Sequence, residues 1–95
     1  MGAILRIEHP VPDYDAWKHA FDADPIGRAQ AGVQRYRIMR PVDDVGRVLV
    51  DLEFDDLGEA EAMLARLQGL WASIDGTIMS SPEARVVDVV EFAVV

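Results

Sequence analysis

Residues 33–54, VQRYRIMRPVDDVGRVLVDLEF, contain two alternating runs on either side of a short turn-rich segment. The runs at 33–40 and 47–54 each alternate with the period of two that is typical of β-strands. The segment between them, 41–46, supplies the Pro, Asp and Gly residues that turns prefer. The stretch therefore predicts an antiparallel β-hairpin, and the flanking segments are expected to complete its sheet.

The segment before the hairpin predicts a strand followed by a helix. Residues 3–9, AILRIEH, alternate with a period of two, and Pro10 prevents the strand from continuing. Asp13 is a suitable N-cap for a helix with one apolar stripe. That stripe consists of Tyr14, Trp17 and Phe21.

This first helix is expected to stop at Pro25. Residues 26–31, IGRAQA, predict a further helical turn, because no breaker falls inside them except one glycine. Gly32 is then placed to end the turn in a left-handed conformation. The chain is expected to enter the hairpin directly after it.

The segment after the hairpin predicts a long helix, a loop and a last strand. Asp56 and Glu59 stand in the spacing of a capping box, and an apolar stripe follows them. Residues 75–84 predict a loop, and 85–95, RVVDVVEFAVV, predict a long final strand rich in β-branched residues. The stripe on the helix consists of Ala60, Met63, Leu64, Leu67, Leu70, Trp71 and Ile74.

The predicted element order is βαββαβ, in a single domain that spans residues 1–95. Right-handed crossovers between the two halves produce a four-stranded antiparallel sheet of order 4-1-3-2, with both helices on one face. The fold class is therefore α+β, a ferredoxin-like plait. A chain of 95 residues buries a thin core, so help from a partner is plausible.

Composition excludes several classes of function. The formal net charge of −8 disfavours nucleic-acid binding, which requires clustered Lys and Arg. The chain has no cysteine, so thiolate metal sites and cysteine nucleophiles are excluded, and two histidines alone do not build a zinc site. No apolar run reaches the roughly 20 residues that span a bilayer. We expect a soluble, cytoplasmic protein without metal, membrane or nucleic-acid partners.

The face of the sheet turned away from the helices is predicted to carry both charged and apolar residues. Alternation directs Val87 and Val89 toward the helices and Asp88 away from them, and it places Arg6 between the 47–54 strand and Asp88. Lateral pairing of opposite charges and an apolar patch favour a homodimer joined sheet to sheet, with residues 91–95 reaching across. An ordinary solvated face is the alternative. The outward set is Ile4, Arg6, Glu8, Arg35, Arg37, Met39, Leu49, Asp51, Glu53, Asp88, Val90 and Phe92.

The whole pattern resembles the dimeric α+β barrel superfamily. The resemblance rests on the element order, the first helix DYDAWKHAFDAD at 13–24, the hairpin and second helix GVQRYRIMRPVDDVGRVLVDLEFDDLGEAEAML at 32–64, and the apolar last strand. Within that superfamily the chain is most similar to the antibiotic biosynthesis monooxygenase-like proteins and their uncharacterised bacterial relatives. This resemblance covers nearly the whole chain.

The resemblance implies a dimer joined through its sheets, with a pocket between sheet and helices in each subunit. It also implies a range of chemistry, since some members oxygenate polycyclic aromatics or quinols without metal or flavin and others degrade haem. Haem-degrading relatives use an Asn on the first strand and a His on the second helix. This chain has no Asn, and no His at 57–74, so that subgroup is disfavoured and no cofactor is expected.

Two histidines are candidates for chemistry. His9 ends the first strand, where it is predicted to reach the mouth of the pocket and to act as a general base, since a histidine titrates near neutral pH. The alternative is a rim histidine bonded to a loop carbonyl. His19 lies away from the apolar stripe of its helix and is expected to be solvated. The acids Asp13 and Asp15 are expected to stabilise the helix N-terminus.

The candidate ligand-binding residues are Trp17, Arg28, Tyr36 and Trp71. The three aromatic residues either fill the core or line a cavity for a flat aromatic ligand. Arg28 either anchors an anionic or phenolic oxygen or forms a surface ion pair with Asp22 or Asp24.

Three functions remain open. The first is a dimeric protein of unknown function with a pocket for a small aromatic ligand, and the second is a cofactor-independent monooxygenase of aromatic, polyketide-like or quinol substrates. The third is a structural dimer with a filled core. Phosphate loops, nucleophile elbows, zinc helices and calcium loops are absent from the sequence.

Overall fold

The computed structural model describes residues 2–74 and 82–95, and its elements follow the predicted order βαββαβ. Both strands of the predicted hairpin and both helices begin or end within one or two residues of their expected bounds. Most of the loop predicted at 75–84 lies outside the described residues. The elements are β1 (Ala3–Pro10), α1 (Tyr14–Ala23), β2 (Val33–Met39), β3 (Arg47–Phe54), α2 (Leu57–Ile74) and β4 (Glu83–Asp88).

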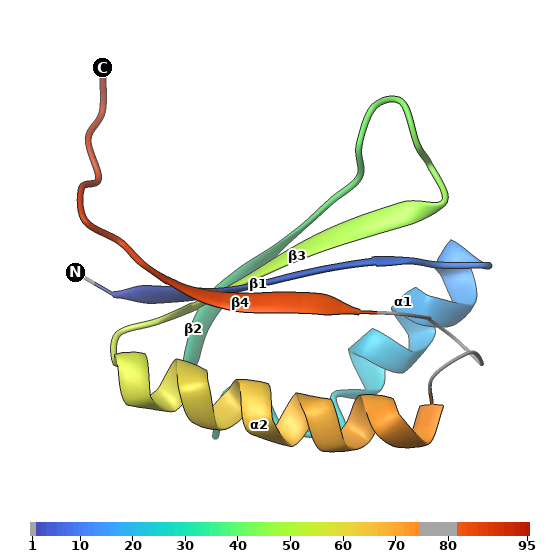
Figure 1. The fold of residues 1–95 in the computed structure, drawn as a ribbon, viewed down its shortest axis with the longest axis horizontal. Helices are drawn as coiled ribbons and strands as arrows, with labels where there is room; N and C mark the ends of the chain where they lie inside the picture. Colours follow the sequence, from blue (N-terminus) through green and yellow to red (C-terminus); the bar gives the residue numbers. More distant parts are fainter. Residues whose placement is uncertain (1, 75–81) are drawn as a thin grey trace.

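The four strands form one antiparallel sheet of order β2-β3-β1-β4, which confirms the ferredoxin-like plait. Both helices lie on the same side of the sheet, as Figure 1 shows. The central strands β1 and β3 pair over eight positions, from Ala3 opposite Phe54 to Pro10 opposite Arg47. Sheet and helices thus make two layers, and no helix or strand of the described residues covers the other face of the sheet.

The hydrophobic core lies between the two layers. The central strands contribute most of it because each has a neighbour on both sides, and α2 adds Ala60, Met63 and Trp71. Trp17 is the one buried residue of α1. Within the described ranges, no helix is long and apolar enough to cross a bilayer. The buried apolar residues of the strands are Ala3, Leu5, Ile7, Val48, Val50, Leu52 and Phe54.

Local sequence determines how α1 begins and ends. The Asp13 carboxylate accepts hydrogen bonds from the backbone N–H groups of Asp15 and Ala16, at 3.0 and 3.3 Å, as an N-cap does. The helix ends at Asp24, which adopts a left-handed conformation with φ of 54°. Residues 28–32 form hydrogen-bonded turns in place of a regular helix, and Gly32 closes them at φ of 102°, where other residues are strained.

The last strand differs from its prediction in length and in the direction of its side chains. The strand ends at Asp88, because its partner β1 begins at Ala3. The next hydrogen bond, from the Val89 N–H to the Gly2 carbonyl, already lies outside β1. Val87 pairs with Ile4 and is 37% exposed on the uncovered face, so the expectation that it faces the helices is wrong. Ala84 and Val86 pack on the core instead. Arg6 accordingly lies opposite Arg85, and the predicted position beside Asp88 is incorrect.

Two segments rise from the uncovered side of the sheet at its opposite ends. Figure 1 shows the β2–β3 loop and the C-terminal segment both directed away from the helices. Each carries exposed apolar side chains, with Val42 and Val45 on the loop and Val90 and Phe92 on the C-terminal segment. The two segments flank the uncovered face of the sheet.

Candidate functional site

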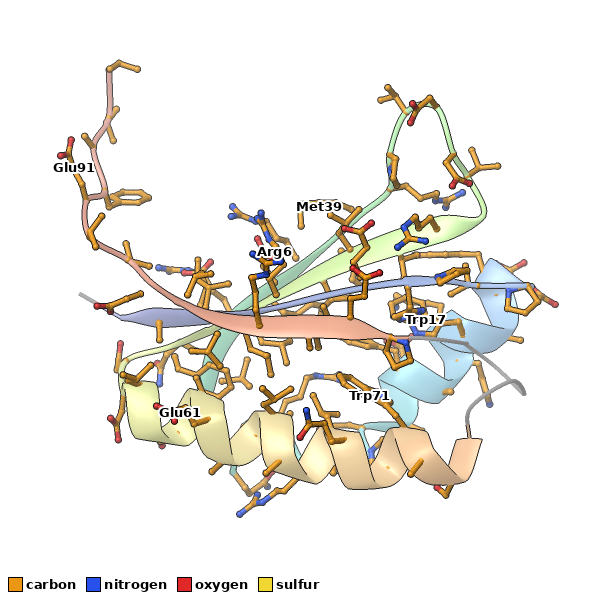
Figure 2. All side chains as sticks on the ribbon, in the orientation of Figure 1. Arg6, Trp17, Met39, Glu61, Trp71 and Glu91 are labelled. Carbon is orange, nitrogen blue, oxygen red and sulfur yellow. The ribbon has the colours of Figure 1, made fainter. Side chains whose placement is uncertain are left out.

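A cavity of about 80 Å³ lies between the sheet and the helices. Its wall is mostly apolar, and its polar atoms belong to one histidine, one aspartate, one arginine and the indole N–H groups of two tryptophans. Figure 2 shows Trp17 and Trp71 in this layer, below the sheet, with Arg6 and Met39 on the other side. The lining residues are Ile7, His9, Trp17, Phe21, Asp24, Ile26, Arg28, Val50, Leu52, Met63, Leu67 and Trp71.

His9 is a buried wall residue of this cavity, with only 1% of its surface exposed. It pairs with Val48 in the sheet, and strand alternation turns it toward the helices together with Ile7 and Leu5. His9 was expected at the mouth of a pocket but is buried in the cavity wall, because the strand continues through Pro10. Its bond to the Pro10 carbonyl agrees with the alternative of a histidine bonded to a loop carbonyl.

The hydrogen bond of His9 defines its tautomer. Nδ1 lies 3.1 Å from the Pro10 carbonyl oxygen, which accepts and cannot donate, so Nδ1 carries the proton. Nε2 is then the unprotonated acceptor of the ring. Burial lowers the pKa of His9 below the ordinary value of 6.5, against the Pro10 carbonyl, which raises it, and with a further lowering by the Arg47 charge. The ring is therefore a neutral acceptor at physiological pH.

A row of aromatic contacts forms one wall and extends beyond the cavity. The Trp17 ring lies 5.6 Å from the His9 ring and 5.2 Å from the Phe21 ring, between centroids. Phe21 in turn meets Tyr36 edge to face at 5.1 Å. These separations are typical of favourable aromatic pairs. The row links the buried His9 to the half-exposed side chain of Tyr36 on β2.

Arg28 closes this row at the mouth of the cavity. Its guanidinium carbon lies 3.9 Å from the Phe21 ring centroid and 5.1 Å from that of Tyr36. Nη1 donates to the Phe21 carbonyl at 2.8 Å and lies 3.5 Å from Asp24 Oδ1. Of the two predicted ion-pair partners, Asp24 is the one used, because Asp22 binds Lys18 at 2.7 Å.

Four of the five predicted site residues meet around this one cavity: His9, Trp17, Arg28 and Trp71. Tyr36 is the exception, since it is 44% exposed and lines an adjoining groove of about 430 Å³ together with Asp24 and Arg28. From the sequence, Phe21 was expected only to anchor α1, and Asp24 only to pair with Arg28. The i, i+4 spacing from Trp17 to Phe21 was the signal that could have placed Phe21 on the wall.

The neutral state of His9 predicts a pH dependence of stability. Because the unfolded chain binds a proton at 6.5 and the folded chain only at lower pH, the free energy of unfolding should be highest above pH 6.5 and fall as the pH drops below it. The His9→Gln variant should lack this part of the decline. Urea unfolding at pH 7.5 and 5.5, at one protein concentration, measures it.

His19→Gln is the matched control for that experiment, since His19 is exposed on the outer side of α1, as predicted. It should keep the wild-type difference between the two pH values. An unchanged difference in His9→Gln would contradict the assignment of His9 as a buried neutral group.

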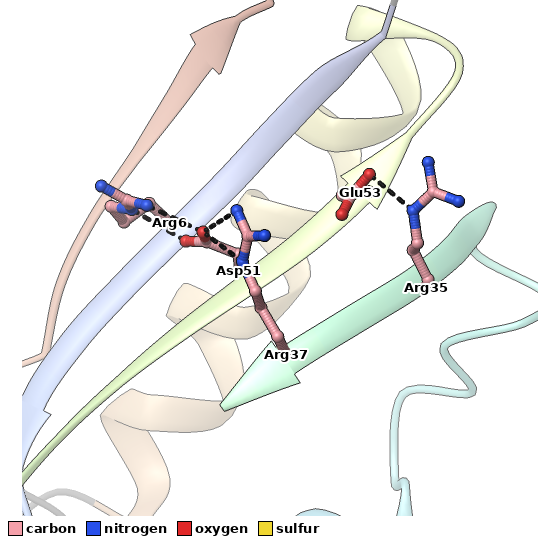
Figure 3. Close-up of polar contacts among 5 residues, drawn as sticks. All are labelled: Arg6, Arg35, Arg37, Asp51 and Glu53. Atoms are coloured by element: carbon pink, nitrogen blue, oxygen red, sulfur yellow. Dashed lines mark hydrogen bonds and ion pairs between the residues drawn. The ribbon is translucent and has the colours of Figure 1, made fainter. Parts of the chain in front are cut away.

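The uncovered face of the sheet is organised around Asp51. Arg6 donates from Nε and Nη2 to the two carboxylate oxygens, both at 2.8 Å, and Arg37 adds contacts of 3.2 and 3.3 Å from β2 (Figure 3). The two arginines cover the carboxylate so fully that its side chain is 0% exposed. The hydrogen bonds from Arg6 lower the pKa of Asp51 below its ordinary value although burial opposes them, and Arg37 adds to the lowering.

Most of the remaining charges on this face also pair across strands. Arg35 binds Glu53 at 2.8 Å, and Arg47 binds Glu8 at 2.6 Å. The face holds five arginines against four acids, a formal +1, whereas the chain as a whole carries −8. The negative charge therefore lies elsewhere, and the uncovered face is close to neutral. Its charged residues are Arg6, Glu8, Arg35, Arg37, Arg47, Asp51, Glu53, Glu83 and Arg85.

Comparison with solved structures places the fold among a set of small dimeric and oxygenase proteins. SnoaB, a cofactor-independent oxygenase from Streptomyces nogalater, superimposes with a TM-score of 0.69 at 14% identity, over 96% of this chain and 95% of that one. A protein from Deinococcus radiodurans, provisionally described as an antibiotic biosynthesis monooxygenase, gives 0.68 at 14% identity, over 98% and 97%. A dimeric ferredoxin-like protein from an uncultured marine organism gives 0.63 at 14% identity, over 98% and 100%.

No family model and no curated protein sequence matches this chain. The structural likeness confirms the predicted resemblance at the level of the fold. The identities are too low to transfer a reaction or a ligand.

Proposed function

We propose that the protein is a homodimer joined through the uncovered faces of its sheets, and that each subunit binds a small aromatic ligand in the cavity between sheet and helices. The observation that carries the ligand proposal is the cavity wall itself. Trp17, Phe21 and Trp71 provide flat apolar surface, and the wall residue His9 provides one hydrogen-bond acceptor, Nε2. Such a combination, mostly apolar with a few polar groups, is typical of ligand sites.

The cavity volume limits the size of that ligand. An engineered cavity that binds one benzene ring has a volume of about 150 Å³. The cavity here has about 80 Å³, roughly half that volume. A single ring would therefore enter only in part and extend into the adjoining groove beside Tyr36. A polycyclic ring system does not fit unless the side chains move, so the proposal is restricted to ligands with one ring.

The dimer proposal rests on the near-neutral uncovered face and on its apolar members. Ile4, Met39 and Leu49 are only half-buried there, and the flanking Val90 and Phe92 are more than 80% exposed. Apolar groups so exposed on a single chain usually mark an interface. Because most charges of the face are paired internally, two copies can meet without leaving a large excess of one sign.

Intrinsic fluorescence tests the ligand proposal, because both tryptophans of the chain line the cavity. Titration with single-ring phenols and aromatic acids should change the tryptophan emission and saturate, and calorimetry should give the same dissociation constant. Sedimentation equilibrium tests the dimer. A monomer at micromolar concentration would contradict the dimer proposal. No response to any single-ring compound at millimolar concentration would contradict the ligand proposal.

A second function, cofactor-independent oxygenation, is favoured by the neutral Nε2 acceptor of His9 inside an apolar cavity. A phenol or enol bound there would lose its proton to Nε2, and the resulting carbanion would react with dioxygen. A single-ring hydroquinone would take up one oxygen atom as a ring hydroxyl and become the hydroxyquinone, and the other oxygen atom would leave as water with two hydrogens. Oxygen uptake with single-ring hydroquinones should be at least tenfold slower in His9→Ala; equal rates would remove His9 from the reaction.

A further inference from the structure

The two ends of the aromatic wall differ in charge. At the inner end stands His9, a neutral group that accepts a hydrogen bond, and at the mouth stands Arg28, a permanent cation. Contacts of 5.6, 5.2 and 3.9 Å connect them in the order His9, Trp17, Phe21, Arg28. A ligand that follows this wall would therefore meet a positive charge where it leaves the cavity.

Aromatic contacts and hydrogen bonds hold Arg28 in one position, and the hydrogen bonds involve only Nη1 of its guanidinium. Phe21 and Tyr36 lie under its plane, Nη1 donates to the Phe21 carbonyl, and the side chain is 17% exposed. Among residues 2–74 and 82–95, no acceptor binds Nε or Nη2. These two N–H groups form the edge of the fork that binds a carboxylate through two parallel hydrogen bonds.

Asp24 does not fully neutralise this arginine. Its Oδ1 accepts the backbone N–H of Arg28 at 2.9 Å, and the distance from Oδ1 to Nη1 is 3.5 Å, longer than a charge-assisted hydrogen bond. The carboxylate of Asp24 thus acts mainly on the backbone of the turn after α1. The guanidinium keeps its capacity to bind a second carboxylate on the side of Nε and Nη2.

We propose that the cavity selects small aromatic acids, with the carboxylate on Arg28 at the mouth and the ring against Phe21 and Trp17. This inference rests on the proposed ligand cavity and adds its ligand class. Arg28 lines both the cavity and the adjoining groove, so a carboxylate bound there lies where solvent can still hydrate it in part. The ring then needs only the limited space that the cavity provides.

The test compares two compounds of similar shape, benzoate and benzyl alcohol, by tryptophan fluorescence and calorimetry. The wild-type protein should bind benzoate about tenfold or more tightly than benzyl alcohol, since hydrogen bonds to charged groups are the stronger kind. Arg28→Gln should lose that preference and keep its affinity for benzyl alcohol, which shows that the cavity is intact. Added salt should weaken the binding of benzoate alone.

Arg66→Gln is the matched control, because Arg66 is exposed on α2 and its loss changes the net charge by the same amount. It should retain the preference for benzoate. Equal affinity for the two compounds in the wild type, or an unchanged preference in Arg28→Gln, would overturn the assignment of the ligand class and leave the cavity proposal standing. Failure of both compounds to bind would overturn both.

Discussion

Replacement of Trp17 by alanine should lower the free energy of unfolding by about 3–5 kcal/mol, as expected for a large aromatic residue removed from a core. Trp17 is 5% exposed and is the one buried residue of α1, so the contact between this helix and the sheet depends on it. It also touches Tyr14, His9 and Phe21, at 5.8, 5.6 and 5.2 Å between ring centroids. Urea unfolding followed by circular dichroism, at one protein concentration, measures the change.

The same substitution should enlarge the cavity and allow a single ring to enter it completely. Indole or benzene at millimolar concentration should then raise the melting temperature of Trp17→Ala more than that of the wild type. His19→Ala, on the exposed side of the same helix, should change stability by less than about 0.5 kcal/mol. A loss of less than 1 kcal/mol in Trp17→Ala would show that α1 is held mainly by other contacts.

Replacement of Leu49 by aspartate should weaken the proposed dimer by at least about 100-fold. Leu49 lies on the uncovered face, between Met39 of β2 and Glu8 of β1. A charge placed there would be buried without a partner in the interface, and two-fold symmetry would introduce it twice. Sedimentation velocity over a range of concentrations should show a monomer where the wild type is a dimer.

Gln68→Asp is the control for charge, since Gln68 is exposed on α2 on the opposite side of the molecule from the uncovered face. It adds the same charge and should leave the dissociation constant unchanged. Circular dichroism should show that both variants retain the fold. A Leu49→Asp protein that still sediments as a wild-type dimer would mean that the uncovered face is not the interface.

The fold could be predicted because its signals are local. The alternation at 33–40 and 47–54, the turn between them and the stripe on α2 each depend on residues close in sequence, and each is found in the structure. The N-cap at Asp13 is equally local, since it needs only the two N–H groups that follow. Such patterns survive because the period of a helix or strand is a property of the backbone.

The last strand was placed on the wrong face because its pattern lacks a period of two. Apolar residues stand at 84, 86, 87, 89 and 90, so either alternate set can face a core. Contact with the core selects Ala84 and Val86, opposite Ile7 and Leu5, and this pairing determines every other side chain of the strand. The register of β4 therefore depends on residues of β1, about 80 positions earlier in the chain.

The candidate site shows the same division. The sequence by itself determined which residue types were available: two tryptophans, one histidine at the end of a strand, and an arginine after the first helix. Only the tertiary structure decided that His9 is buried and bonded to Pro10, that Arg28 rests on Phe21 and Tyr36, and that the space between the layers remains partly open. The physical reason is that alternation and helical period set the direction of a side chain, whereas burial, pKa and cavity volume depend on distances between residues that are far apart in the chain.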